Sequence, residues 1–372
     1  MEIVAHSQHE TGNHLYSSYV MTSGPGIKWT VVAPYLSEFE HPVQTCPHPN
    51  FDKEFVKNWV VKHGVGVAVI GLLVDNATEA YNLATGVGLE GTDWAKGRTP
   101  PTEVKAEKGS MVVSEIFIYG ETILRFVQYK DGYDGIFLPG YKSFKDPAPF
   151  DYGIKRMDHV VGNVWELEPV INNLKKWLGF HVFAFFTKEE IQTEYTSLNS
   201  TVMANNYDTV LMPINEPAKK KRESQITEFL KANNGPGVQH IALFTHDIIA
   251  TIEKMVAVQQ YGGFELIPTP AAYYNDPEIV KIMNEHLTPP VIEAVKKFGI
   301  LVDKDVEGVL LQIFTKPLFD RPTLFVEIIQ RICKGEIVDK AGCGGFGKGN
   351  FRALFESIER MQAERDMLLE DN

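Results

Sequence analysis

Three polar side chains interrupt apolar strand sequences, and all three are of types that bind metals. His159 lies in the run MDHVV, His240 in VQHIA and Glu327 in FVEII. Because side chains alternate between the two faces of a strand, each of the three shares its face with apolar neighbours. A buried carboxylate without a partner costs several kcal/mol, and one cation shared with the two histidines would remove that cost. Two histidines and one carboxylate are the set that holds non-haem Fe(II) and leaves coordination positions open. The sequence therefore predicts an iron site.

Each of these residues also has a simpler interpretation. A histidine in a strand is more often a hydrogen-bonded core residue than a ligand, and Glu327 could pair with Arg321 or Arg331. Arg331 lies four residues beyond Glu327 on the same strand face, whereas Arg321 falls in the preceding turn. The two histidines occupy equivalent positions in two successive repeats, which favours a single shared metal site.

Polar residues that could bind a ligand lie on nearby segments. One is on the strand before Glu327, and the others lie in a strand, a proline-flanked loop and the start of a helix. These side chains could orient a carbonyl or a phenol, although each one alone is explained as well by a surface or capping role. The set is Ser200, Asn215, Gln225 and Gln312.

The elements that would position these residues recur along the chain. The C-terminal half reads as a strand, a helix and three further strands, and this order then returns. The first copy comprises a strand at 156–164, a helix at 166–178 and strands at 180–186, 198–204 and 209–214. The second comprises a strand at 238–244, a helix at 247–259 and strands at 264–267, 309–315 and 323–330. The repeat unit is therefore a βαβββ module.

The N-terminal half contains a third module and part of another. The third has a strand at 65–74, a helix at 77–85 and strands at 115–118 and 123–129. Strands at 15–22 and 27–33 come before it, with no strand and helix ahead of them, so we expect the first module to be incomplete. Tandem modules of this kind indicate an α+β fold with curved, mostly antiparallel sheets in two open-barrel halves.

A linker is expected between the two halves. Pro147, Pro149 and Asp151 mark it by composition. We expect an N-terminal half without metal over residues 1–150, and a catalytic half over 151–372 that carries the iron site and a C-terminal helix.

Composition and charge exclude several classes of protein. The 372 residues are 44% hydrophobic, and the net charge of −12 argues against a nucleic-acid partner. The longest apolar run, residues 64–74, is shorter than the roughly 18 residues that a membrane span needs. The widely spaced Cys46, Cys333 and Cys343 predict neither a disulfide framework nor a zinc site. The first residues do not resemble a secretory signal, so we expect a cytoplasmic protein without a membrane partner.

Two glycine runs match nucleotide-binding patterns but lack the required context. Gly86 to Gly91 fits G-x-G-x-x-G, yet it follows a helix rather than a strand. Gly342 to Lys348 fits G-x-x-x-x-G-K, but Gly349 stands where a magnesium-binding Ser or Thr is needed. The second run is better explained as a hinge before an amphipathic helix over 350–369. That helix either closes a pocket as a lid or packs on the surface.

Longer segments carry a resemblance to a known family. The runs LQIFTKP (311–317), FVEIIQR (325–331) and GCGGFGKGNF (342–351) resemble the 4-hydroxyphenylpyruvate dioxygenase family of the vicinal-oxygen-chelate, or glyoxalase-like, superfamily. So do MDHVVGN (157–163), LNS (198–200), PINEP (213–217) and VQHIAL (238–243). The match covers nearly the whole C-terminal half and is looser in the N-terminal half, where family members usually begin with a further strand and helix.

The resemblance implies roles for individual residues. It implies Fe(II) ligands at His159, His240 and Glu327, the three residues that strand alternation selects. It also implies aromatic rings on either side of the substrate ring. The implied catalytic pocket residues are Ser200, Asn215, Gln225, Gln239 and Gln312, and the implied substrate-binding residues are Phe314, Phe325, Phe346 and Phe351.

The resemblance further implies an enzyme, a non-haem Fe(II) dioxygenase of tyrosine and phenylalanine catabolism. Such an enzyme converts 4-hydroxyphenylpyruvate and O₂ to homogentisate and CO₂, and we expect a homo-oligomer, a dimer or a tetramer. Two alternatives stay open: a 4-hydroxymandelate synthase, which oxidises the benzylic carbon of the same substrate, and a non-catalytic binding protein on the same fold. The large Phe314 and Phe325 favour the dioxygenase over the synthase. The presence of all three ligands argues against the binding protein.

Overall fold

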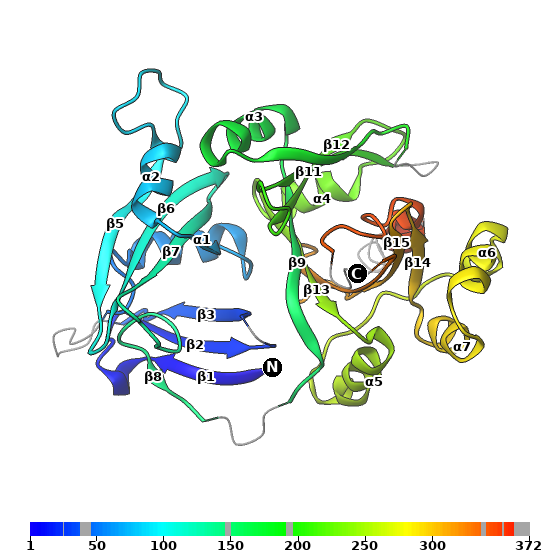
Figure 1. Cartoon of the computed structure of the whole chain (residues 1–372), viewed down its shortest axis with the longest axis horizontal. Helices are drawn as coiled ribbons and strands as arrows, with labels where there is room; N and C mark the ends of the chain where they lie inside the picture. Colours follow the sequence, from blue (N-terminus) through cyan, green and yellow to red (C-terminus); the bar gives the residue numbers. More distant parts are fainter. Residues whose placement is uncertain are drawn as a thin grey trace, which may run out of the picture. The chain divides into compact units, whose positions relative to one another are not determined.

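A computed structural model describes residues 1–24, 26–37, 46–145, 150–190, 196–335, 340–351 and 353–360 (Figure 1). The chain forms two compact units. One comprises Met1–Asp151 with Glu168–Phe180, and the other comprises Tyr152–Leu167 with His181–Asn372. The linker residues Pro147 and Pro149 lie outside the described residues. No helix within the described ranges has both the length and the hydropathy needed to cross a bilayer.

The second unit is built on one eight-stranded sheet, in the order β10-β11-β12-β9-β13-β16-β15-β14. Within each module the last strand pairs in parallel with the first, β12 with β9 and β16 with β13. The two first strands, β9 and β13, pair antiparallel and join the modules. The strands are β9 (Ile154–Asn163), β10 (His181–Phe186), β11 (Ser197–Ala204), β12 (Leu211–Ala218), β13 (Gly237–Thr245), β14 (Leu301–Lys304), β15 (Gly308–Phe314) and β16 (Phe325–Cys333). The predicted α+β fold of βαβββ modules is confirmed.

Helices connect these strands, and one predicted strand is missing. The helices are α4 (Gln225–Ala232), α5 (Ile248–Val258), α6 (Pro277–His286) and α7 (Pro289–Phe298). The expected strand at 264–267 was wrong, because only one isolated bridge forms there, between Leu266 and Thr315. Pro268 and Pro270 cannot donate ladder hydrogen bonds, so pairing stops after that bridge. The edge beside β15 is occupied by β14 instead.

The first unit contains two four-stranded sheets, β3-β2-β1-β8 and β4-β7-β6-β5. As in the other modules, the last strand β7 pairs in parallel with the first strand β4. The strands are β1 (Glu2–Ser7), β2 (Tyr16–Thr22), β3 (Lys28–Pro34), β4 (Val69–Leu73), β5 (Gly97–Lys105), β6 (Ser110–Tyr119), β7 (Thr122–Lys130) and β8 (Lys142–Ser143). The helices are α1 (Lys53–His63), α2 (Ala77–Thr85) and α3 (Leu167–Leu178).

Three strands of the first unit escaped the sequence interpretation: β1, β5 and the two-residue β8. We expected no strand ahead of residue 15, yet β1 pairs antiparallel with β2 and buries Ala5 and Ser7. The six residues of β1, EIVAHS, do not alternate regularly between apolar and polar types, so no strand is predicted from them. The strand β5 contains Pro100 and Pro101, which an edge strand tolerates because one side of its backbone bonds to no neighbour.

Local caps explain where the helices begin and end. The side chain of Asn76 accepts hydrogen bonds from the backbone N–H groups of Thr78 and Glu79 and begins α2. Gly86 ends the same helix with φ of 68°, a left-handed conformation that glycine adopts without strain. The glycine run Gly86 to Gly91 therefore begins at the C-terminal cap of α2. This agrees with the argument that it is not a dinucleotide-binding loop.

The cysteines differ from the prediction. Cys333 at the end of β16 and Cys343 form a disulfide, with Cα atoms 5.8 Å apart, and Cys46 is free. The expectation that the cysteines would form no bridge was therefore wrong for this pair. Cys343 is ten positions after Cys333, and the bridge holds it beside the end of β16.

A buried ionic cluster lies inside the first unit. Glu115 on β6 is fully buried and contacts His48, Arg98 and Arg125 at 2.5 to 3.0 Å. Burial by itself raises the pKa of Glu115, but the His48 hydrogen bond and the arginine charges outweigh it and hold the pKa well below its usual range. The carboxylate therefore stays ionised and balances two nearly buried guanidinium groups.

Removing this charge should destabilise the first unit. In Glu115→Gln the two guanidinium groups lose their counter-charge, and we expect unfolding to become easier by about 3 kcal/mol. Urea unfolding followed by tryptophan fluorescence measures the change. The matched control is Glu54→Gln, because the Glu54 side chain on α1 is 71% exposed and its pair with Lys57 should contribute little. Equal unfolding midpoints for the two variants would contradict the role of the cluster.

Candidate active site

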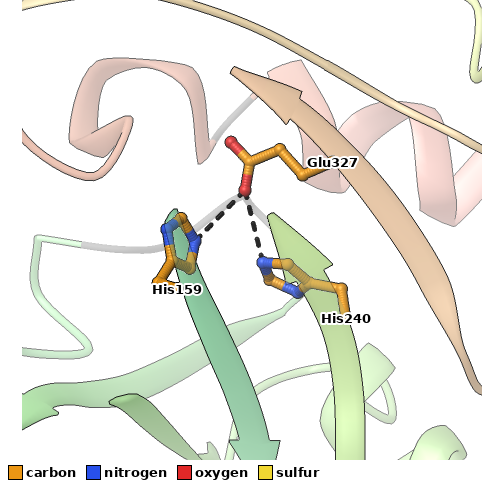
Figure 2. Close-up of side chains that lie close together, drawn as sticks. All are labelled: His159, His240 and Glu327. Carbon is orange, nitrogen blue, oxygen red and sulfur yellow. Dashed lines mark ion pairs between the residues drawn. The ribbon is translucent and has the colours of Figure 1, made fainter. Parts of the chain in front are cut away.

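The three predicted metal ligands lie on adjacent strands of the eight-stranded sheet. Ala242 on β13 is opposite His159 on β9 and also opposite Glu327 on β16. His240 lies two residues before Ala242, so all four side chains share one face of the sheet. Figure 2 shows the two imidazole rings and the carboxylate converging on one point.

The distances fit a metal centre. Oε2 of Glu327 lies 3.2 Å from Nε2 of His159 and 3.4 Å from Nε2 of His240. One ligand atom from each of the three residues lies within 4.8 Å of the others. Two imidazole nitrogens and a carboxylate, buried together, are a donor set that a divalent transition metal satisfies. The described residues can therefore hold a metal ion.

Within the described residues each arginine has a partner other than Glu327, against the simpler interpretation. Arg331 forms its ion pair with Asp158, and Arg321 donates to the backbone oxygen of Ala232. Glu327 instead accepts a hydrogen bond of 3.0 Å from Nε2 of Gln312, which fixes the orientation of its carboxylate.

The electrostatics of the three residues are strongly coupled. Burial raises the pKa of Glu327, but the close contacts with His159 and His240 outweigh it and lower the pKa to about 2. Burial lowers the pKa of His159, yet its hydrogen bonds to Asp158 and Glu327 raise it to about 9. For His240 the effect of burial dominates, and the pKa is lowered. Without metal, a protonated His159 therefore neutralises Glu327.

The ligands open into a pocket with about 620 Å³ of space, counting the part open to solvent. Every site residue expected from the sequence lines it. These are the ligands His159, His240 and Glu327, the polar residues Ser200, Asn215, Gln225, Gln239 and Gln312, and the aromatic residues Phe314, Phe325, Phe346 and Phe351. Ionisable side chains thus lie at one end of the pocket, and amide and aromatic side chains form its walls.

Hydrogen bonds hold the polar wall in place. The side-chain oxygen of Gln239 accepts from Nδ1 of His240 at 2.9 Å, which leaves Nε2 of that ring to face the ligand centre. Asn215 donates to the side-chain oxygen of Asn163 at 3.2 Å. Both amides are therefore oriented by neighbouring side chains.

The aromatic wall surrounds the two histidines. The Phe325 ring stacks on His240 with centroids 4.8 Å apart, and Phe314 meets the same imidazole edge-on at 6.2 Å. Phe346 meets His159 edge-on at 5.5 Å. Phe351 contacts Phe355 at 6.0 Å, from the helical stretch 353–360.

The C-terminal helix covers the pocket. Leu354 and Phe355 line it and pack in the same core cluster as Phe314 and Phe325. The predicted helix over 350–369 is described only as far as residue 360, and the rest lies outside the described residues. The glycine run approaches the site closely, because a Cβ at Gly347 would collide with the Gln312 side chain.

Sequence reasoning missed several residues of the site. Asn350 is buried and donates to Oε1 of Gln312 at 3.0 Å, while its own oxygen accepts from the Tyr273 hydroxyl at 2.6 Å. An asparagine after a glycine run gives no sign of this position. Further pocket residues are Val161, Phe186, Leu198, Val202, Pro213, Gly347, Leu354 and Phe355. Apolar residues on strands and helices look like ordinary core in a single sequence.

The fold and the centre together define a member of the glyoxalase and dioxygenase superfamily. Residues 156–279 match the model of the family described as "Glyoxalase/Bleomycin resistance protein/Dioxygenase superfamily". Curated relatives are more specific. The chain is 43% identical to 4-hydroxyphenylpyruvate dioxygenase of Plectranthus scutellarioides over 97% of this chain and 83% of that protein. It is 40% identical to the Arabidopsis thaliana protein of that name, over 97% and 82% of the two chains.

The chain therefore belongs to the 4-hydroxyphenylpyruvate dioxygenase family, a family of enzymes. A relative from Aspergillus fumigatus with the same name is 39% identical over 98% of this chain and 87% of its own. Among solved structures, a triple mutant of 4-hydroxymandelate synthase from Streptomyces coelicolor superposes with a TM-score of 0.75 over 97% of this chain and 91% of that one. It is 23% identical to this chain, so the likeness shows the shared fold alone.

Metal binding should release a proton. Because the pKa of His159 is raised to about 9, its ring is protonated at neutral pH when no metal is bound. A metal must displace that proton, so we expect about one proton released per ion and an affinity that rises with pH until about pH 9. Calorimetric titration with Co(II) in buffers of different ionisation enthalpy measures both quantities. An affinity that does not change between pH 6 and 8 would contradict the protonated state of His159.

Proposed function

We propose that this chain is an Fe(II)-dependent dioxygenase that converts 4-hydroxyphenylpyruvate and O₂ to homogentisate and CO₂. The observation that carries the proposal is a triad of a buried histidine, a half-buried histidine and a buried glutamate at the end of an aromatic and amide-lined pocket. His159, His240 and Glu327 are the proposed ligands. Iron, when bound, supplies the redox chemistry with oxygen that no amino-acid side chain provides.

The residues of the chain have separate tasks in this proposal. The negative charge of Glu327 offsets the charge of the metal, and Gln312 holds that carboxylate in place. The rings of Phe314, Phe325 and Phe351 offer apolar faces to the substrate ring. The pocket amides and Ser200 are available for its keto acid and phenol groups, and the C-terminal helix keeps water out of the site.

The chemistry needs no further reactant. 4-Hydroxyphenylpyruvate and O₂ contain together the same atoms as homogentisate and CO₂, and the keto acid that loses CO₂ is part of the substrate itself. The role of the protein is to hold the ring close to the metal and orient it. We place this activity in tyrosine and phenylalanine catabolism.

The second candidate is 4-hydroxymandelate synthase, whose product carries oxygen on the benzylic carbon. Phe314 and Phe325 favour the dioxygenase, because two large rings fill the wall beside His240. A non-catalytic binding protein would have no need of three intact ligands. The assignment of residues 151–372 as the catalytic half, the homo-oligomeric state and the cytoplasmic location stay predictions.

The product and the ligands can be tested together. The chain, incubated with Fe(II), ascorbate and 4-hydroxyphenylpyruvate in air, should give homogentisate as the main product by chromatography and mass spectrometry. Each of His159→Ala, His240→Ala and Glu327→Ala should abolish activity, because a ligand is lost. The control is His181→Ala, since His181 is exposed on β10 and pairs with Asp208. Hydroxymandelate as the main product would favour the synthase, and full activity in all three ligand variants would refute the metal site.

The aromatic wall can be tested at Phe351. An offset pair of rings contributes about 0.5–1.5 kcal/mol beyond burial, so Phe351→Ala should raise the KM for the substrate by roughly threefold to tenfold. Steady-state oxygen uptake measures KM and kcat separately. The control is Phe185→Ala, whose side chain is 67% exposed and outside the pocket. Equal KM values in the two variants would mean that Phe351 and the C-terminal helix only pack against the second unit and do not contact the substrate.

A further inference from the structure

A second buried ion pair stands directly behind the ligand His159. Nε and Nη2 of Arg331 donate to Oδ1 and Oδ2 of Asp158 at 3.0 and 2.7 Å, a two-point contact between fully buried side chains. Oδ2 of Asp158 also accepts from Nδ1 of His159 at 2.8 Å. With its Nδ1 proton held there, the His159 ring turns Nε2 towards Glu327 and the metal position.

The backbone of β9 is distorted at this point. His159 lies opposite Ala242 and Met157 opposite Leu243, so Asp158 is the extra residue of a β-bulge. A bulge interrupts the strict alternation of faces and re-aims a side chain. It allows two consecutive residues, Asp158 and His159, to bond to each other while the imidazole still faces the ligand centre.

Arg331 has a further set of contacts, with the glycine segment Gly342–Gly347. Its Nη1 donates to the backbone oxygens of Cys343 at 2.6 Å and of Gly345 at 2.7 Å. The next residue, Phe346, places its ring 5.5 Å from the Arg331 guanidinium and 5.5 Å from the His159 ring. One side chain thus contacts both the partner of a ligand and the segment that carries a wall of the pocket.

A buried ion pair is weak evidence for stability, because apolar residues of similar volume often stabilise a fold as well. Packing alone also does not explain the contacts of the Arg331 guanidinium. It bonds to two backbone carbonyls of the glycine segment and to the Asp158 carboxylate, which in turn bonds to His159. This combination is what a coupling element between the loop and the ligand requires.

We propose that Asp158 and Arg331 are positioning residues that fix the orientation of His159 and couple it to the glycine segment over the pocket. The inference rests on the metal site proposed above. When the segment is in place, Arg331 holds Asp158, and Asp158 holds the imidazole in the tautomer that binds the metal through Nε2. When the segment is displaced, the carboxylate and the ligand lose that support together.

The test is Arg331→Lys, which keeps the charge but cannot make the two-point contact and both carbonyl contacts. Co(II) is the probe, added to the full chain and followed by its visible absorption and by competition with a chelator. We expect Co(II) affinity to fall 10-fold to 100-fold, as it does when the outer partner of a ligating histidine is changed. The absorption spectrum should shift, and in the metal-free chain the amides of residues 340–347 should exchange hydrogen faster.

The matched control is Arg156→Lys. Nη1 of Arg156 also donates to Asp158, at 3.0 Å, but Arg156 is partly exposed and pairs with the bulge rather than the glycine segment. Arg156→Lys should leave the Co(II) affinity, the Co(II) absorption spectrum and the amide hydrogen exchange of residues 340–347 as they are in the unaltered chain. Equal losses in the two lysine variants would overturn the coupling to the loop.

A second variant covers the case in which Arg331→Lys does not fold. The double variant Asp158→Asn/Arg331→Met removes both charges of the buried pair together, and the new side-chain amide oxygen can still accept a hydrogen bond from His159. It should therefore fold, bind Co(II) more weakly and show the faster exchange of residues 340–347. Folded variants with unchanged Co(II) affinity, spectrum and exchange would overturn the inference. Failure of the unaltered chain to bind Co(II) more tightly than His159→Ala would instead refute the metal site itself.

Discussion

A carboxylate enclosed by apolar side chains needs a positive partner, and Glu327 sets that requirement for the whole second unit. Its oxygen lies within 3.4 Å of two imidazoles from two different modules, so the fold must bring three separate segments to one point. The pairing of β9 with β13 and of β13 with β16 meets the requirement, because it makes the three strands neighbours. Metal binding, the aromatic wall and the support behind His159 all depend on that register.

The first unit shows the same architecture with different chemistry. In the parallel pair β4 and β7, Gly71 lies opposite Arg125, as Ala242 lies opposite Glu327 in β13 and β16. On β6, the other neighbour of β7, Glu115 lies opposite Arg125. The matching position on β15, the other neighbour of β16, is Phe314, which lies opposite Glu327. The buried charge is thus balanced by other side chains within the unit. One module type supports an ionic core in one unit and a candidate metal site in the other, so the site residues rather than the fold decide the function.

Strand alternation and repeat position were enough to select from the sequence the three residues that lie together and could hold a metal ion. A polar residue between apolar neighbours is visible locally, and its recurrence at equivalent positions of two modules ties distant segments together. The limits of α2 were also readable, because Asn76 and Gly86 are capping residues by type. The amides and phenylalanines of the pocket came from longer matching segments, since no local pattern separates them from core or surface residues.

What the sequence by itself determined was therefore the module order, the ligand triad and the main elements around it. Only the tertiary structure decided that Arg331 pairs with Asp158 rather than with Glu327, that Cys333 meets Cys343, and that Asn350 lies against Gln312. It also decided that β1 and β5 are strands and that 264–267 is not. Local periodicity reports which face a residue occupies, whereas cross-strand register, sheet edges and the partner of a buried charge are set by contacts between segments far apart in the chain.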